Sequence, residues 1–220
     1  MQDKKLYLAS RSPRRAALLR QMGFTFETLP ADVPEDNESA EDPVQHALAL
    51  SRRKAEAVLD RVAEGVVVGA DTVVVLNGVL FGKPRNGDEA RDMLARLSGK
   101  THTVVTGFTL IHRPSGQIIS DFEKTDVTFR SLESWEVDAY ASTPHPLDKA
   151  GAYGIQDPSG LFVERIDGCF YNVVGFPLTR FYGALKRMWG RETLGRVLRG
   201  TGITPAAGGM EPALPYPDTV

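Results

Sequence analysis

Residues 6–19 read LYLASRSPRRAALL, and this stretch predicts a strand, a turn and a helix in direct succession. The apolar run at 6–8 is typical of a short buried strand. Small hydroxyl residues end it, and Pro13 then stands at the first helical position, where no backbone N–H is needed. Apolar residues at helical spacing follow, so the segment predicts a helix whose first turn carries Arg14 and Arg15.

Those two arginines are unfavourable for the helix itself, because the first turn and its dipole favour acidic residues. An anion bound at the helix N-terminus would offset that cost. A strand, a serine-rich turn containing Ser10 and a basic helix N-terminus together predict a phosphate cradle. The alternative interpretation is a pair of solvated surface arginines.

The rest of the chain alternates between apolar runs typical of strands and helical patterns. Strands are expected at 6–9, 26–29, 66–76, 103–112, 118–130 and 161–166, and helices at 13–22, 43–62, 88–97, 132–141 and 177–198. The early alternation favours parallel pairing, whereas the long runs on either side of 114–116 predict an antiparallel hairpin. We therefore expect an α/β fold with a mixed twisted sheet and flanking helices. Glycine, proline and alanine dominate from about residue 200, so 1–199 should form one domain and 200–220 a disordered or loosely docked tail.

The composition is that of an ordinary globular protein, with 42% hydrophobic and 25% charged residues among 220. Lysine and arginine total 26 against 28 acidic residues, and the net charge of −2 argues against a general polyanion binder. The single cysteine, Cys169, allows no internal disulfide and suits a reducing compartment. Because no apolar run reaches membrane-spanning length and no signal-peptide pattern is present, we expect a cytoplasmic protein.

Asp71 and Thr72 interrupt an otherwise continuous β-branched run, VVVGADTVVVL at 66–76. A buried carboxylate without a partner is costly, so Asp71 needs a cation or hydrogen-bond donors, or must lie at a strand bend on a cleft. Gly69, just before it, predicts a close approach or a bulge. Asp71 is a candidate ligand for a hard divalent ion or a general base acting on water, and the alternative is an aspartate in a strand-end turn.

Two lysines are candidates for phosphate binding. Lys83 lies between a glycine and a proline, after a hairpin turn predicted at Asn77-Gly78, and such a loop would hold its ammonium group in place. Lys54 shares a helical face with apolar residues, so it is the basic residue of 52–54 expected to point inward. For both, the alternative is a solvated surface lysine.

Residues 148–156 read DKAGAYGIQ, and two glycines in four residues predict a tight, non-regular backbone. The amide of Gln156 carries a donor and an acceptor, so it is able to recognise a nucleobase edge that presents the complementary pair. A loop-structuring role for Asp148, Lys149 and Gln156 is the alternative. The sequence contains no GxGxxG, Walker A or GxSxG motif, and its four histidines lack metal-ligand spacing.

In order along the chain, these segments resemble the Maf family of nucleoside triphosphate pyrophosphatases. The similarity spans roughly residues 5–190 and keeps the order of the family's motifs. The matching segments are LASRSPRRAALL at 8–19, RKA at 53–55, GADTVV at 69–74, GKP at 82–84, LSGKTHTVVTG at 97–107, DKAGAYGIQ at 148–156 and NVVGFPL at 172–178.

The resemblance implies an elongated α/β fold, related to the inosine triphosphate pyrophosphatases, with a deep cleft between two lobes. It implies hydrolysis of a nucleoside triphosphate to the monophosphate and pyrophosphate, assisted by a divalent metal such as Mg²⁺ or Mn²⁺. Family members are usually cytoplasmic and often homodimeric. Asp71 matches the family's catalytic carboxylate. The side chains expected to line the triphosphate channel are Ser10, Arg14, Arg15, Lys54 and Lys83.

The resemblance also indicates the branch of the family that prefers dTTP and UTP. That branch is matched by Arg14, Thr72 and Gln156, whereas the branch that prefers 7-methyl-GTP has other residues there and lacks the DKAGAYGIQ loop. Modified pyrimidine nucleotides stay open as substrates. Two matches are loose: residues 157–160 differ from the small residues usual after Gln156, and Glu35 only approximates a functional glutamate that would share the metal with the catalytic carboxylate.

Two classes of function fit these residues. One is the enzyme, and the other is a nucleotide-sensing or nucleic-acid-binding regulator, linked to septum formation, that uses the same cradle without catalysis. The near-neutral composition argues against extended nucleic-acid contact, and a binder gains nothing from Asp71 facing a polyanion without a metal. We therefore expect an enzyme acting on a nucleoside triphosphate, with no stable nucleic-acid complex and no membrane association.

Overall fold

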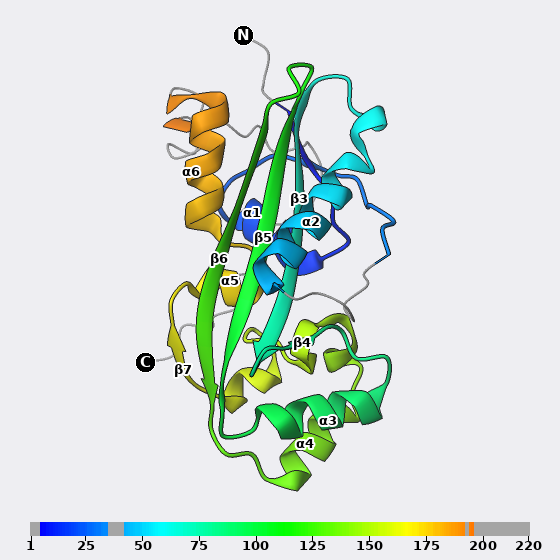
Figure 1. The fold of residues 1–220 in the computed structure, drawn as a ribbon, viewed down its shortest axis with the longest axis vertical. Coiled ribbons are helices and arrows are strands. Elements are labelled where there is room, and N and C mark those ends of the chain that lie inside the picture. Colours follow the sequence, from blue (N-terminus) through cyan, green and yellow to red (C-terminus); the bar gives the residue numbers. More distant parts are fainter. Residues whose placement is uncertain (1–4, 35–41, 192–193, 196–220) are drawn as a thin grey trace, which may run out of the picture.

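The computed structural model describes residues 5–34, 42–191 and 194–195, which form a mixed seven-stranded sheet with flanking helices (Figure 1). The strands lie in the order β2-β1-β3-β5-β6-β7, and β4 pairs with β3 beside this path. The strands are β1 (Leu6–Leu8), β2 (Glu27–Thr28), β3 (Gly65–Leu76), β4 (Val79–Phe81), β5 (Thr101–Arg113), β6 (Ile118–Phe129) and β7 (Val163–Asp167). The α-helices are α1 (Pro13–Gln21), α2 (Pro43–Glu56), α3 (Gly87–Leu97), α4 (Ser134–Ala141), α5 (Phe170–Val174) and α6 (Leu178–Trp189). Short 3-10 turns are η1 (Leu59–Arg61), η2 (His145–Asp148), η3 (Ala150–Ala152) and η4 (Pro158–Phe162).

The pairing of the strands confirms the predicted mixed α/β sheet. β1 runs parallel to β2 and β3, and the other neighbouring strands pair antiparallel. β5 and β6 form the long hairpin expected around 114–116. The turn expected at Asn77-Gly78 joins β3 to β4, and both of its residues have the positive φ angles that such a turn requires.

The helix predicted over 43–62 is too long, because α2 ends at Glu56. Val58 leaves helical geometry and the 3-10 turn η1 follows. This change of geometry lets both Val58 and Val62 pack into the core against Val67 of β3. An uninterrupted helix would keep a period of 3.6 residues per turn, whereas the core contacts of Val58 and Val62 are made through a tighter 3-10 turn.

Other elements also differ from the sequence expectation. The strand expected at 161–166 begins at Val163, since the two residues before it belong to η4. The five-residue helix α5 has no counterpart in the sequence analysis, because a helix of that length is too short for a periodic pattern. The helix expected at 177–198 is interrupted: α6 ends at Trp189, Gly190 has a φ of 82°, and the described residues 191 and 194–195 are again helical. The proposed tail at 200–220 lies outside the described residues.

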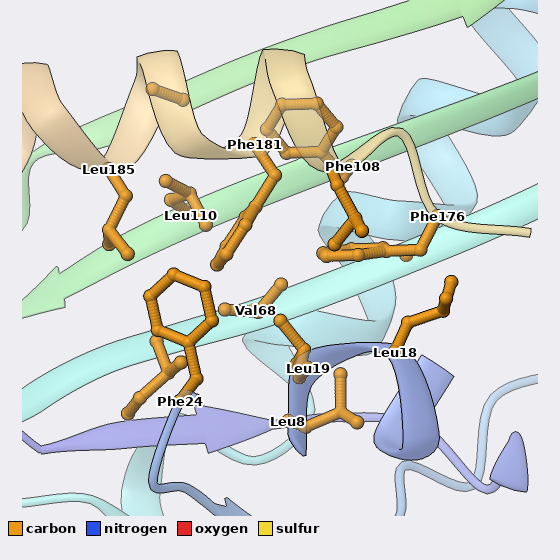
Figure 2. Packing of buried hydrophobic residues seen from close by; sticks show 14 of the residues in the cluster. Leu8, Leu18, Leu19, Phe24, Val68, Phe108, Leu110, Phe176, Phe181 and Leu185 are labelled. Carbon is orange, nitrogen blue, oxygen red and sulfur yellow. The ribbon is translucent and has the colours of Figure 1, made fainter. Parts of the chain in front are cut away.

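Two cores lie at opposite ends of the long strands β3, β5 and β6, and they make the two expected lobes (Figure 1). In the first, α1 and α6 cover one face of the sheet, and Val68 meets Phe108 and Phe181 there (Figure 2). In the second, α3 and α4 pack around the other end of the strands, against residues such as Val74 and Phe129.

α2 covers the opposite face of the first lobe and lies directly on two glycines of the sheet. A Cβ atom added to Gly69 of β3 would lie 2.0 Å from the Ser51 carbonyl oxygen. One added to Gly107 of β5 would lie 2.7 Å from the Ala47 carbonyl carbon. The helix backbone therefore occupies the space of two missing side chains, and the close approach predicted at Gly69 is confirmed.

Candidate active site

A gap in the edge of the sheet opens between the two lobes. Along one edge of β3, β1 pairs with residues 66–68 and β4 with residues 74–76, while β5 covers the other edge. Within the described chain, residues 69–73 therefore have no strand beside them on the first edge. A cavity of about 550 Å³ opens here, beyond the carboxyl end of β1, and both lobes contribute to its walls. Asp71 lies in the middle of this gap.

Asp71 and Lys54 form a buried ion pair in the lining of the cavity. Lys54 Nζ lies 2.6 Å from Asp71 Oδ1, and the two side chains are 10% and 8% exposed. α2 brings Lys54 there because the two glycines beneath it let the helix lie on the sheet. Lys54 points inward, as its helical face predicts, and supplies the cation that a buried carboxylate requires.

The turn after β1 starts α1 as the sequence predicts. Ser12 is the N-cap, its side chain accepts from the Arg15 backbone N–H, and Pro13 takes the first helical position. The Ser12 backbone N–H donates to Ser10 Oγ at 3.1 Å. These local bonds hold Ser10 and the first turn of α1 at the rim of the cavity, where both belong to its lining.

Arg15 is built into the cavity wall. Its Nε donates to the Gly175 carbonyl at 2.8 Å, and its Nη1 donates to the Ala70 carbonyl at 2.9 Å and to Ser10 Oγ at 3.2 Å. Its Nη2 donates to Thr72 Oγ1 at 2.9 Å. The guanidinium thus joins the turn after β1, the open edge of β3 and the end of α5. Its bond to Ala70 supplies a hydrogen-bond donor to a carbonyl in the part of β3 that has no strand beside it on this edge.

Arg14 and Lys83 reach the cavity from opposite lobes. The Arg14 side chain is 25% exposed, and its Nη1 donates to Asp148 Oδ2 at 2.7 Å across the cleft. Lys83 lies in the loop after β4 and is exposed. Cations outnumber carboxylates in the lining, which contains Arg11, Arg14, Arg15, Lys54, Lys83 and Lys149 against Asp32, Asp71, Asp148 and Asp157. The cavity is suited to an extended anion.

The loop around 148–157 forms the wall of the cavity on the side of the second lobe. Its backbone is non-regular as predicted: Gly151 has a φ of 69° and Ala152 a φ of 63°. A Cβ at Gly151 would lie 3.0 Å from a methyl group of Val74, so the loop lies directly on β3. Gln156 lies in the cavity lining with its side chain exposed, which leaves the amide accessible to a ligand.

Beneath this loop, His102 of β5 is buried and supports Tyr153. His102 Nε2 lies 2.8 Å from Tyr153 Oη, and the imidazole is edge-on to the rings of Tyr153 and Phe129. Its Nδ1 is buried without a hydrogen-bond partner among the described residues. Burial lowers the pKa of His102 to about 4, although the charge of Asp126 acts in the opposite direction.

The depressed pKa of His102 predicts a loss of stability in acid. An unfolded histidine titrates near pH 6.5, so the unfolded state binds more protons between pH 6.5 and about 4, and the free energy of unfolding falls as the pH drops through this window. Between pH 6.5 and 4.5, the free energy of unfolding of His102→Gln should fall by about 2 kcal/mol less than that of the wild type. Denaturant unfolding at the two pH values measures the difference. His112→Gln removes a histidine from the same strand, outside this cluster. If it reduced the pH dependence of unfolding as much as His102→Gln does, the effect would not be due to His102.

The carboxylates of the cavity fit one mode of divalent-metal binding. The described residues contain no group of three or more His, Cys, Asp or Glu side chains placed to hold a metal ion. Mg²⁺, however, is commonly bound by one or two carboxylates together with substrate phosphates. Asp71 fits that mode, since it is a carboxylate in a cavity suited to a phosphate chain. Glu35, the second candidate ligand, lies outside the described residues.

Within the described residues, no helix is long and apolar enough to cross a bilayer.

Comparison with known proteins identifies the family. The sequence profile described as "Maf-like protein" matches residues 5–188. The dTTP/UTP pyrophosphatase of Carboxydothermus hydrogenoformans is 48% identical, over 84% of this chain and 99% of that one. That of Caldicellulosiruptor bescii is 43% identical, over 84% of this chain and 95% of that one. Among solved structures, the Ham1 protein of Staphylococcus aureus aligns with a TM-score of 0.49 at 12% identity, over 84% of this chain and 100% of that one. The family profile and the two relatives confirm the resemblance seen in the motifs: this chain belongs to the Maf family.

Proposed function

We propose that this protein hydrolyses dTTP and UTP, or modified pyrimidine nucleotides, to the monophosphate and pyrophosphate. The carrying observation is the buried Asp71–Lys54 pair in a sheet-edge gap, within a cavity lined mainly by cations. Relatives named dTTP/UTP pyrophosphatase, at 42–48% identity, support the same reaction.

The cationic lining binds and neutralises the triphosphate. Arg14 at the N-terminus of α1 and Lys83 from the other lobe lie on opposite walls, so a phosphate chain between them would contact both. Ser10 and the first turn of α1 add a hydroxyl and backbone N–H groups. Arg15 keeps this wall in place through its bonds to Ala70 and Thr72, and its charge lies close behind the phosphates.

Asp71 is the residue proposed to act on water. A water molecule beside its carboxylate attacks the α-phosphorus, the bond from that phosphorus to the bridging oxygen breaks, and pyrophosphate leaves. Asp71 accepts the proton that the water loses, while Lys54 orients the carboxylate before the step through its hydrogen bond to Oδ1. Asp71, with Glu35, would also hold a Mg²⁺ or Mn²⁺, which when bound neutralises charge on the phosphate oxygens.

Selectivity for the base is assigned to Gln156, Thr72 and Arg14. Gln156 offers a donor and an acceptor to the base from the second lobe. Thr72 lines the cavity from β3, where its hydroxyl is held by Arg15 and by Thr106 Oγ1 at 2.9 Å. We further propose that the protein is a cytoplasmic homodimer and forms no stable complex with nucleic acid.

Pyrophosphate release from a panel of nucleoside triphosphates, with Mg²⁺ or Mn²⁺, tests this function. We expect release from dTTP and UTP at rates well above those for ATP and GTP, as for the relatives named dTTP/UTP pyrophosphatase. Release should stop when EDTA removes the metal. A folded protein that releases no pyrophosphate from any of these nucleotides would instead favour the regulator that binds without catalysis.

A further inference from the structure

Four residues of alternating charge form a continuous chain across the cleft, which we call the ion-pair chain: Arg14, Asp148, Lys149 and Asp157. Arg14 Nη1 lies 2.7 Å from Asp148 Oδ2, and Lys149 Nζ lies 2.6 Å from Asp148 Oδ1. Lys149 Nζ also lies 3.1 Å from Asp157 Oδ2. The ion-pair chain therefore connects the first turn of α1, in the first lobe, to the loop of the second lobe.

The ion-pair chain is partly buried: its Lys149–Asp157 pair is shielded from solvent, whereas the Asp148 side chain is 52% exposed. Lys149 and Asp157 are only 9% and 16% exposed, so solvent screens their interaction weakly. Arg14 uses two donors, since its Nη2 also donates to the Asp148 backbone carbonyl at 3.1 Å. Burial opposes ionisation of Asp148, but hydrogen bonds from Lys149 and Arg14 outweigh it and hold its pKa below the usual range.

The two ends of the ion-pair chain coincide with the two halves of the proposed substrate site. Arg14 stands where the triphosphate is proposed to bind, and Asp157 directly follows Gln156, which is proposed to contact the base. Asp157 in turn fixes the loop, because it accepts from the Ser159 backbone N–H and from Tyr140 Oη.

At Gly154, the backbone of the loop passes close to the ion pair of Lys149 and Asp157. A Cβ at Gly154 would lie 2.7 Å from Lys149 Cε and 2.9 Å from Asp157 Oδ2. The backbone therefore passes directly over the Lys149–Asp157 pair, two residues before Gln156. Movement of the pair would displace the residues that carry the amide.

We infer that the ion-pair chain positions the base-contacting loop against the phosphate site, and that Asp148 determines base selectivity through it. This inference rests on the proposed function and extends it to Asp148, Lys149 and Asp157, three residues of the cavity lining to which the proposed function gives no role. Arg14 then has two roles, since it binds phosphate and anchors the loop that contacts the base.

Asp148→Asn separates these two roles, because it keeps the shape of the side chain and removes its charge. Arg14 is then held less firmly by the loop, and one negative charge leaves the cavity. We expect inorganic tripolyphosphate, which has no base, to bind several-fold more tightly. The preference for dTTP over GTP should fall on the order of tenfold, because the loop loses its charged contacts with Arg14 and Lys149 and keeps only weaker hydrogen bonds. Calorimetric binding of tripolyphosphate, dTTP and GTP in metal-free buffer measures both effects without turnover.

The matched control is Glu136→Gln, the same carboxylate-to-amide change in another arginine pair of the second lobe. Glu136 Oε1 lies 2.6 Å from Arg130 Nη2, and neither residue lines the cavity. This variant should unfold at a lower temperature and keep the wild-type preference for dTTP. The inference is overturned if Asp148→Asn keeps that preference, or if it binds tripolyphosphate more weakly. Failure of the proposed function is a separate result, because it appears as absent pyrophosphate release from the wild type.

Discussion

Asp71→Asn should lower the rate of pyrophosphate release from dTTP by about a thousandfold, at saturating nucleotide and metal. The asparagine amide keeps the size of the side chain, but it neither takes a proton from water at neutral pH nor binds a divalent cation as a carboxylate does. The affinity for dTTP in metal-free buffer should rise, since the cavity loses a negative charge that faces the polyanion. Loss of turnover with tighter binding would locate the defect in the chemical step.

Stability must be separated from chemistry in this variant, because Asp71 is also the buried partner of Lys54. Removing one charge of a buried pair leaves the other uncompensated, and Asp71→Asn should therefore lose up to about 3 kcal/mol in the free energy of unfolding. The double variant Lys54→Met, Asp71→Asn should recover much of that loss and remain inactive. Asp121→Asn on β6, outside the cavity, serves as the matched control and should retain full activity. Wild-type turnover by folded Asp71→Asn would remove Asp71 from the mechanism.

Local patterns predicted the parts of the site that are built from neighbouring residues. The strand, the small hydroxyl residues after it and Pro13 all act within a few residues of one another, so the start of α1 follows from the sequence. Asp71 could be singled out because a carboxylate inside a β-branched run needs a partner. The helical period placed Lys54 on the inner face of α2, and this is where its partner lies.

Contacts between residues far apart in the chain could not be predicted in this way. Arg14 and Asp148 are separated by 134 residues, and Arg15 and Gly175 by 160, so no spacing rule relates them. The gap in the edge of β3 is likewise a property of the whole sheet, since it arises where β1 has ended and β4 has not yet begun. A loop-structuring role for Asp148 and Lys149 is one of the two interpretations of the sequence, but only the fold joins these residues to Arg14.

Gly69→Ala should lower the free energy of unfolding by about 3 kcal/mol or more, the upper end for overpacking of a core. The added methyl group would lie 2.0 Å from the Ser51 carbonyl oxygen and 2.8 Å from the Ala55 backbone nitrogen. Both are backbone atoms of α2, so no side-chain rotation relieves the clash and the helix itself must move. Denaturant unfolding followed by circular dichroism measures the loss. The matched control is Gly183→Ala in α6, where nothing lies within 4 Å of the added carbon.

In that control the same chemical change should stabilise the protein by about 0.5–1 kcal/mol, since alanine replaces glycine inside a helix. Gly69→Ala should also reduce turnover at temperatures where it remains folded, because displacement of α2 takes Lys54 away from Asp71. A higher concentration of dTTP should not restore this activity, since the defect lies in the Lys54–Asp71 ion pair rather than in substrate binding. If folded Gly69→Ala retained wild-type turnover, the placement of Lys54 by α2 would not matter for the reaction. A loss of turnover in Gly69→Ala but not in Gly183→Ala would link the close contact of α2 with the sheet to the chemistry at Asp71.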